Sequence, residues 1–179
     1  MNRVDYRSLI HALEASAAMG AASTLADFVW AFWSLPHRMV YGLLHGAALC
    51  LFLGLVLGLL APRRPWPRAA GGALLVGLIS AASFYLLAPL MSWWALFASW
   101  MILWMLTALL NRWIRDDASS VQTALLRGVC AAVLSGAAFY AVSDMWLSPP
   151  PGGPNYLVFF LKWTFAFLPG FFCLLIRYR

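Results

Sequence analysis

Six polar side chains stand out because they interrupt stretches of sequence that are otherwise apolar. An unpartnered charge at the centre of a membrane costs about 2.5 to 3.5 kcal/mol on insertion scales, so charges in such stretches are expected to pair with each other or with a ligand. Helical spacing also aligns Tyr41 with His45 on one face. We predict one ligand-binding polar site near the outer membrane surface, formed by Asp27, Arg38, Tyr41, His45, Asp144 and Lys162.

His45 is the most informative member of this predicted site. It lies two helical turns beyond His37 and therefore deeper in the membrane, where an imidazole without a partner is costly. A hydrogen bond to Asp27 or Asp144 would satisfy it. The alternative interpretation is a purely structural clamp, because charged side chains near the interface reach water at little cost and the acids can simply pair with nearby basic residues.

The sequence offers no recognisable metal, haem or catalytic motif. Zinc needs three or four ligands at close spacing, and no HxxxH, HExxH or CxxC run occurs. A haem held between two helices needs histidines on both, whereas His37 and His45 belong to one segment. Asp27 and Asp144 could form a carboxylate dyad, so an intramembrane enzyme ranks third. We predict no metal, no cofactor and no catalytic residue.

The composition points to a membrane as the solvent for this chain. It is 64% apolar and 10% charged, against roughly half and a quarter in soluble domains, and its mean hydropathy is +0.81. The net charge of +6 comes from short basic runs between apolar segments, which is typical of topology signals rather than of nucleic-acid binding. Cys50, Cys130 and Cys173 lie within apolar segments and are expected to be small packing residues.

Six apolar segments are each long enough to cross a bilayer, which takes about 20 residues. They cover residues 15–34, 38–61, 69–88, 91–110, 124–147 and 156–176. Proline-rich breaks separate several of them, and Ser119-Ser-Val-Gln122 matches a capping box at the start of the fifth helix. The sequence therefore predicts an all-α fold, a bundle of six transmembrane helices that forms a single transmembrane domain over residues 1–179.

The basic residues predict the orientation of this bundle, because cytoplasmic loops retain Lys and Arg. The two ends of the bundle would carry Arg3, Arg7, Arg63, Arg64, Arg68, Arg112, Arg115, Arg127, Arg177 and Arg179 on one side, and Arg38 and Lys162 on the other. We therefore expect both termini in the cytoplasm of a bacterial cell, with the chain in its cytoplasmic (inner) membrane. A cleaved signal peptide is the alternative for the first segment, but the stretch before it is long and mixed in charge.

Two short segments resemble one another and suggest internal duplication. Ser80-Ala-Ala-Ser-Phe-Tyr85 in the third predicted helix is similar to Ser135-Gly-Ala-Ala-Phe-Tyr140 in the fifth. The spacing suggests three related helical hairpins. Chance similarity is the alternative, because runs of small residues are common in membrane helices.

Small residues follow one another at four-residue spacing in two of the predicted helices. The second helix carries Gly42, Gly46, Cys50, Gly54 and Gly58, and the fifth carries Gly128, Ala132, Gly136, Tyr140 and Asp144. Such stripes let helix backbones approach closely. We expect the first stripe to pack inside the chain, with a homo-oligomer or membrane-protein partner bound through Gly42, Gly46, Gly54 and Gly58 as the alternative.

Two further features bear on how the interior is used. Trp93, Trp100 and Trp104 form a stripe into the fourth helix, for which contact with lipid or packing is favoured over the lining of an apolar pocket. Pro169-Gly170 interrupts the sixth helix and predicts a kink there. Kinked helices occur in transporters and in static bundles alike.

These patterns favour a polytopic membrane protein that binds a small molecule, ion or lipid in an outward-facing polar pocket, as a transporter, transporter subunit or sensor. The alternative is a structural or assembly subunit that packs against another membrane protein. The bilayer is the predicted partner in both cases, and no nucleic acid is expected.

Overall fold

The computed structural model describes residues 6–32, 38–62, 65–92, 94–142 and 155–175, and all of its regular structure within those ranges is α-helical. The helices are α1 (Tyr6–Phe32), α2 (Arg38–Leu60), α3 (Trp66–Met91), α4 (Trp94–Ile114), α5 (Val121–Val142) and α6 (Tyr156–Leu175). Each predicted apolar segment falls on one of them, so the all-α fold class is confirmed. Helices α2 to α6 are long and apolar enough to cross a membrane.

Helix α1 has a different character from the other five. It begins at Tyr6 rather than at residue 15, because the polar residues before residue 15 are also helical. Within this polar part, the imidazole of His11 contacts the carboxylate of Glu14, one turn later, at 3.0 Å. Ser, Thr and Gly residues and Asp27 dilute its apolar content, and it does not reach the hydropathy of the five candidate spans.

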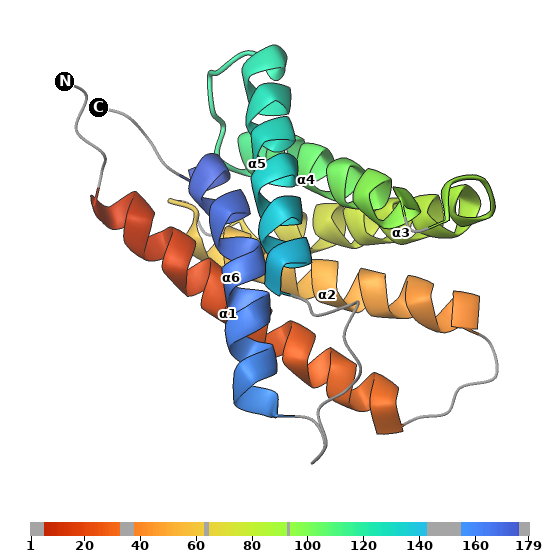
Figure 1. The fold of residues 1–179 in the computed structure, drawn as a ribbon. Helices are drawn as coiled ribbons and strands as arrows, with labels where there is room; N and C mark the ends of the chain where they lie inside the picture. The colour runs from red at the N-terminus through yellow and green to blue at the C-terminus, as the bar shows by residue number, and fades with distance from the viewer. Residues whose placement is uncertain (1–5, 33–37, 63–64, 93, 143–154, 176–179) are drawn as a thin grey trace.

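Consecutive helices from α2 to α6 pack side by side in antiparallel fashion, and α1 closes the arrangement by packing mainly against α6 (Figure 1). The direction of the α2 and α3 pair follows from Gly42 lying near Tyr85 while Gly58 lies near Trp66. Helix α1 contacts α2 much less than it contacts α6. The six helices therefore form an incomplete ring whose loosest joint lies between α1 and α2.

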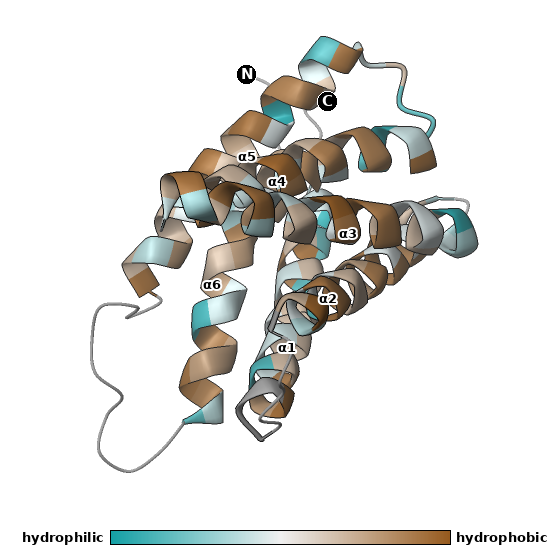
Figure 2. Cartoon of the chain, turned by 90° about the vertical axis from the view of Figure 1, so that its right-hand side faces the viewer, coloured by the Kyte–Doolittle hydropathy of each residue, from teal (hydrophilic) through white to brown (hydrophobic). Residues whose placement is uncertain are grey.

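The outward faces of these helices are as apolar as their interiors. Brown, hydrophobic residues occur along the length of the helices in Figure 2, between paler and teal ones. Leu86, Leu90 and Leu157 are exposed over 72%, 83% and 66% of their surface. Largely exposed leucines on long apolar helices are what contact with lipid requires.

The glycine stripe of α2 packs against α3 of the same chain. A methyl group built on Gly54 would lie 2.4 Å from the carbonyl oxygen of Ala69, and one built on Gly77 would lie 2.4 Å from that of Gly46. Since apolar side chains gain nothing by leaving lipid, backbone contact of this kind drives helix association in membranes. The interior packing predicted for this stripe is the contact observed.

Trp104 fills the space between α4 and α6 and is 2% exposed. Its indole lies so close to Gly170 that a methyl group built there would be 2.2 Å from the ring, and its ring contacts Phe171 edge-on at 5.4 Å. Of the two favoured assignments, lipid contact or packing, packing is the one observed for Trp104, because Gly170 leaves room for the indole in the core. Trp93 lies outside the described residues.

The start of α5 is one residue later than the predicted capping box places it. The hydroxyl of Ser120 accepts a hydrogen bond from the backbone N–H of Thr123 at 3.1 Å, so Ser120 is the capping residue. Ser119 instead donates its backbone N–H to the carboxylate of Asp117 at 3.0 Å. The cap of α5 is therefore Ser120 rather than Ser119, the first residue of the predicted capping box.

Candidate functional site

Asp27 joins the first and last helices of the ring. Its Oδ2 accepts a hydrogen bond of 2.6 Å from the indole Nε1 of Trp163 in α6. The carboxylate also interacts electrostatically with the imidazole of His45 in α2. Residues from α1, α2 and α6 therefore meet in one polar unit, which we call the Asp27–His45–Trp163 unit.

The other residues of the predicted site lie at different distances from this unit. Tyr41 lines the space between α1 and α2 together with His45. Lys162 is half-buried in α6, adjacent in sequence to Trp163. Arg38 begins α2, but its side chain is outside the described part of the structure, and Asp144 lies beyond the described end of α5. Ligand binding by these six residues stays a prediction.

A cavity of about 290 Å³ lies beside the Asp27–His45–Trp163 unit, in the middle of the ring. Ligand pockets in proteins are usually apolar and aromatic, with a small number of polar groups, and this cavity has that character. Side chains from α1, α2, α3, α4 and α6 line it, among them Ser23, His45, Ser80, Phe84, Tyr85, Ser99, Trp100, Trp163 and Phe167.

Three hydrogen-bond donors on the cavity wall have no partner among the described residues. They are the hydroxyls of Ser23 and Ser80 and the indole N–H of Trp100. Ser23 is 1% exposed and Ser80 is 7% exposed. A buried polar group without a partner costs about 1 to 3 kcal/mol, and native structures contain few of them. Ser23, Ser80 and Trp100 all line this cavity, so a molecule in it that accepted hydrogen bonds from them would remove this cost.

A serine on the same wall shows the contrasting arrangement. The hydroxyl of Ser99 donates to the carbonyl oxygen of Ala95 one turn earlier, at 2.7 Å. Ser135, which occupies in α5 the position that Ser80 occupies in the related segment of α3, donates across to the carbonyl of Ala166. Serines in membrane helices ordinarily satisfy themselves in these two ways, which makes the unpaired Ser23 and Ser80 distinctive.

Stacked aromatic rings hold the indoles of the cavity wall in place. Trp100 stacks on Phe139 with ring centroids 5.5 Å apart and planes at 29°, and Trp163 stacks on Phe167 at 5.8 Å and 25°. Trp100 also contacts Phe167 at 5.5 Å. Because another aromatic ring packs against each of them, the indoles of Trp100 and Trp163 are held in one orientation without a ligand. Pocket lining, the less favoured assignment for Trp100, is the one observed.

Metal chemistry finds no support in the described ranges, where no three histidine, cysteine or acidic side chains gather closely enough to hold an ion. The three cysteines are free thiols. Cys50 is buried and lines the cavity, and Cys173 is partly buried. Cys130 is exposed on α5, so the predicted packing role is wrong for that residue, which points outward from its helix.

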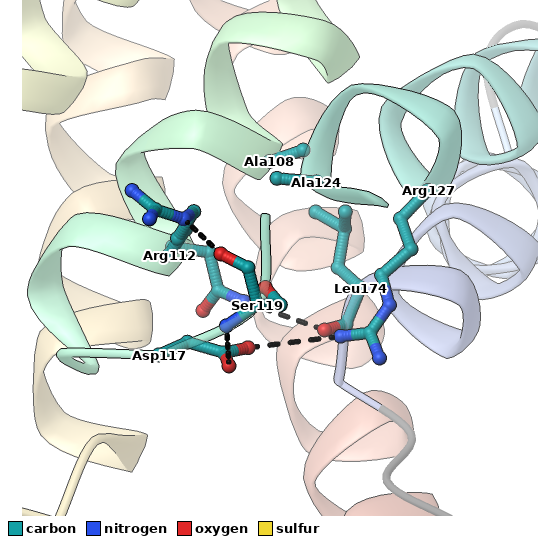
Figure 3. A pocket seen from close by; sticks show the side chains of 8 residues that line it. Ala108, Arg112, Asp117, Ser119, Ala124, Arg127 and Leu174 are labelled. Atoms are coloured by element: carbon teal, nitrogen blue, oxygen red, sulfur yellow. Dashed lines mark hydrogen bonds and ion pairs between the residues drawn. The ribbon is translucent and has the colours of Figure 1, made fainter. Parts of the chain in front are cut away.

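A second polar cluster lies where the C-terminal ends of α4 and α6 meet, a region for which the sequence predicted only a turn (Figure 3). Asn111 donates to the carbonyl of Leu174 at 3.3 Å and accepts from Nε of Arg115 at 2.9 Å. Arg112 donates to the carbonyl of Ser119 at 2.7 Å. The bond from Asn111 caps the end of α6, whose last carbonyls have no partner within their own helix, and the bond from Arg112 holds the loop that follows α4. We interpret this cluster as structural.

The cavity residues Ser23, Ser80, Trp100 and Trp163 were not among the predicted site residues. Ser23 and Asp27 lie one turn apart in the sequence, and Ser80 belongs to the repeated segment, so each carried a weak signal. No sequence pattern distinguishes a serine that bonds its own helix from one that faces a cavity. That difference depends on the neighbouring helices.

No protein-family model, no curated protein and no solved structure matches this chain.

Proposed function

We propose that this protein binds a small, mostly apolar molecule with hydrogen-bond acceptors in the central cavity, and acts as a transporter, a transporter subunit or a sensor. The observation that carries the proposal is that three residues whose donors have no partner, Ser23, Ser80 and Trp100, line one aromatic cavity. A ligand that accepts hydrogen bonds from them offsets the cost of burying them.

The Asp27–His45–Trp163 unit has a supporting role in this proposal. It borders the cavity at the joint between α1, α2 and α6. An ionisable group within a membrane is a functional-site candidate by default, with its partner named. Here Asp27 accepts a hydrogen bond from Trp163, and both Trp163 and His45 line the cavity. The unit therefore positions two of the side chains that would meet the ligand.

The membrane setting follows the charge distribution. Five helices suit a bilayer, and we propose that α1 completes a six-helix bundle by lying against α6, with both termini in the cytoplasm of a bacterium and the chain in its inner membrane. Buried against α6, α1 needs less hydropathy of its own. The related segments of α3 and α5 flank α4, which is compatible with three hairpins of common origin.

An assembly role is the alternative from a different class. This role requires the glycine stripe of α2 to be free to contact another membrane protein. Helix α3 covers Gly46, Gly54 and Gly58, so the packing gives this alternative no free glycine surface at these positions. The unpartnered donors of the cavity also have no role in it.

Native mass spectrometry of the protein purified in mild detergent tests the proposal. Wild type is expected to retain a small molecule of defined mass. Ser80→Leu places a branched side chain in the cavity and should abolish this retention. Gly71→Leu adds the same side chain to the same helix, where a methyl group meets nothing within 4 Å, and should retain the molecule.

A milder variant keeps the test decisive if Ser80→Leu fails to fold. Ser80→Ala removes only the donor and should lower occupancy by about tenfold, the effect of losing roughly one hydrogen bond to a ligand. Equal occupancy in wild type, Ser80→Ala and Ser80→Leu would refute binding in the cavity.

A further inference from the structure

A groove of about 640 Å³ runs between α1 and α2 on the outside of the ring. Its walls are almost entirely apolar, with Leu25 and Val29 from α1 facing Leu44 and Phe52 from α2. The polar members of its lining are Tyr41 and His45. Leu25, Val29 and Leu44 are each exposed over 40% or more of their surface.

The groove exists because α1 and α2 diverge. Helix α1 packs chiefly on α6, and in Figure 1 the second half of α1 runs toward the lower right, away from α2, which lies above it. Helix α2 is one of the five candidate spans. A groove on its outer side therefore opens into the hydrocarbon region of a bilayer, where its natural contents are lipid-like chains.

The groove and the central cavity adjoin each other. His45 and Leu49 line both of them. A molecule lying in the groove thus meets the cavity across the side chains of these two residues, one of which interacts with Asp27. The two spaces have opposite chemistry, since the groove offers hydrocarbon contact and the cavity offers unpartnered donors.

We propose, resting on the function proposed above, that the ligand is a single-chain amphiphile with an uncharged, oxygen-bearing head group. Its chain lies in the groove between α1 and α2, its head reaches the donors of Ser23, Ser80 and Trp100, and it arrives laterally from the bilayer past His45. The molecule is recognised at both ends, by apolar contact along the chain and by hydrogen bonds at the head.

The charge of the head group follows from the groups that meet it. Hydroxyl and indole donors carry no formal charge and suit an alcohol, ester or ketone oxygen. An anionic head is disfavoured because the carboxylate of Asp27 lies beside the cavity. A cationic head would find that carboxylate already engaged by Trp163 and would leave the three donors without acceptors.

Photo-crosslinking with hexadecanol tests this inference in lipid nanodiscs. One probe carries a diazirine at the end of the chain, and the other carries it next to the hydroxyl. The chain-end probe should label groove residues such as Val29 and Leu44, and the head-group probe should label cavity residues such as Ser80 and Trp100. Uniform labelling of the lipid-facing sides of all helices by both probes would overturn the proposal.

A pair of matched variants tests the route. Ala48 is exposed and lines the groove, whereas Ala137 is exposed on α5, which contributes nothing to the lining of the groove. Ala48→Trp should fill the groove and lower labelling of the cavity by the head-group probe about tenfold. Ala137→Trp should leave it unchanged. Equal labelling of the cavity in both variants would overturn access through the groove.

Failure of this inference and failure of the proposed function give different results. If wild type retains a molecule that Ser80→Leu loses, but hexadecanol probes do not compete with it and Ala48→Trp has no effect, the cavity binds another class of ligand. In that case the inference is wrong and the proposed function stands. If neither probe labels the cavity and no molecule is retained by wild type, both are wrong.

Discussion

The indole N–H of Trp163 and the carboxylate of Asp27 form a hydrogen bond of 2.6 Å between α6 and α1, helices at opposite ends of the chain. The bond closes the ring of helices at the level of the central cavity. The same carboxylate interacts with His45 of α2. One acidic side chain therefore joins α1 and α2, which line both the cavity and the groove, to α6, which lines the cavity.

Removing the donor of this bond should weaken the closure of the ring. We expect Trp163→Phe to lower the free energy of unfolding by about 1 to 2 kcal/mol. A charged acceptor strengthens a hydrogen bond, whereas hydrogen bonds between membrane helices are usually weak, and the expected value lies between these two cases. Trp94→Phe serves as control, because Trp94 is 70% exposed. Denaturation in detergent measures both, and equal stability of the two variants would show that the bond contributes nothing.

Backbone contact between α2 and α3 should make Gly54 intolerant of any side chain. Gly54→Leu drives a branched chain into the carbonyl of Ala69, so we expect a loss of about 3 kcal/mol or more, at the upper end of overpacking effects. Gly71→Leu on α3 enters open space and should be tolerated. Thermal melting in detergent distinguishes them. Comparable melting temperatures would mean that α2 and α3 are not in contact at Gly54.

The polar cluster in Figure 3 contains interactions that should differ in strength, and two of its residues, Asn111 and Arg127, test this. Asn111 is 7% exposed and bonds both Leu174 and Arg115, so Asn111→Ala should cost about 1 to 3 kcal/mol and increase amide hydrogen exchange at the end of α6. Arg127 and Asp117 are 3.8 Å apart and about one-third exposed, and Arg127→Ala should cost under about 1 kcal/mol. A larger loss of stability for Arg127→Ala than for Asn111→Ala would contradict the structural role assigned to Asn111.

Reporter fusions test the topology. Fusions after Arg68, within Ser119-Ser120 and at the C-terminus should report cytoplasm, and fusions near Leu90 and Pro151 should report the outside. A fusion near Pro36 should also report the outside if α1 crosses the membrane. A cytoplasmic signal near Pro36 would show that α1 does not span, and one near Pro151 would refute the proposed orientation.

Helix positions were predictable from the sequence because they depend on local properties. Apolar runs of spanning length and breaks at proline fix each segment without reference to its neighbours. The boundaries were less predictable. The early start at Tyr6 and the cap at Ser120 depend on hydrogen bonds within single turns, which several neighbouring polar residues could make equally well.

The interior of the ring was predictable only in part. A deep imidazole needs a partner, and Asp27 lies near enough to His45 to influence it electrostatically, but the hydrogen bond expected between them stays a prediction. Trp163 could not be assigned to Asp27 from sequence, because tryptophans in membrane proteins are more often interfacial anchors. For Trp104 the sequence left lipid contact and packing open, and the position of Gly170 opposite it shows that it packs inside.

A high-resolution experimental density map of the protein extracted with its native lipids tests binding in the cavity most directly. We predict non-protein density in the cavity, with an oxygen atom within hydrogen-bonding distance of at least two of the three donors of Ser23, Ser80 and Trp100. Side chains collapsed into the space, with each donor bonded to its own protein, would contradict the account. Treatment with a delipidating detergent should empty the cavity and lower the melting temperature, as loss of a bound ligand requires.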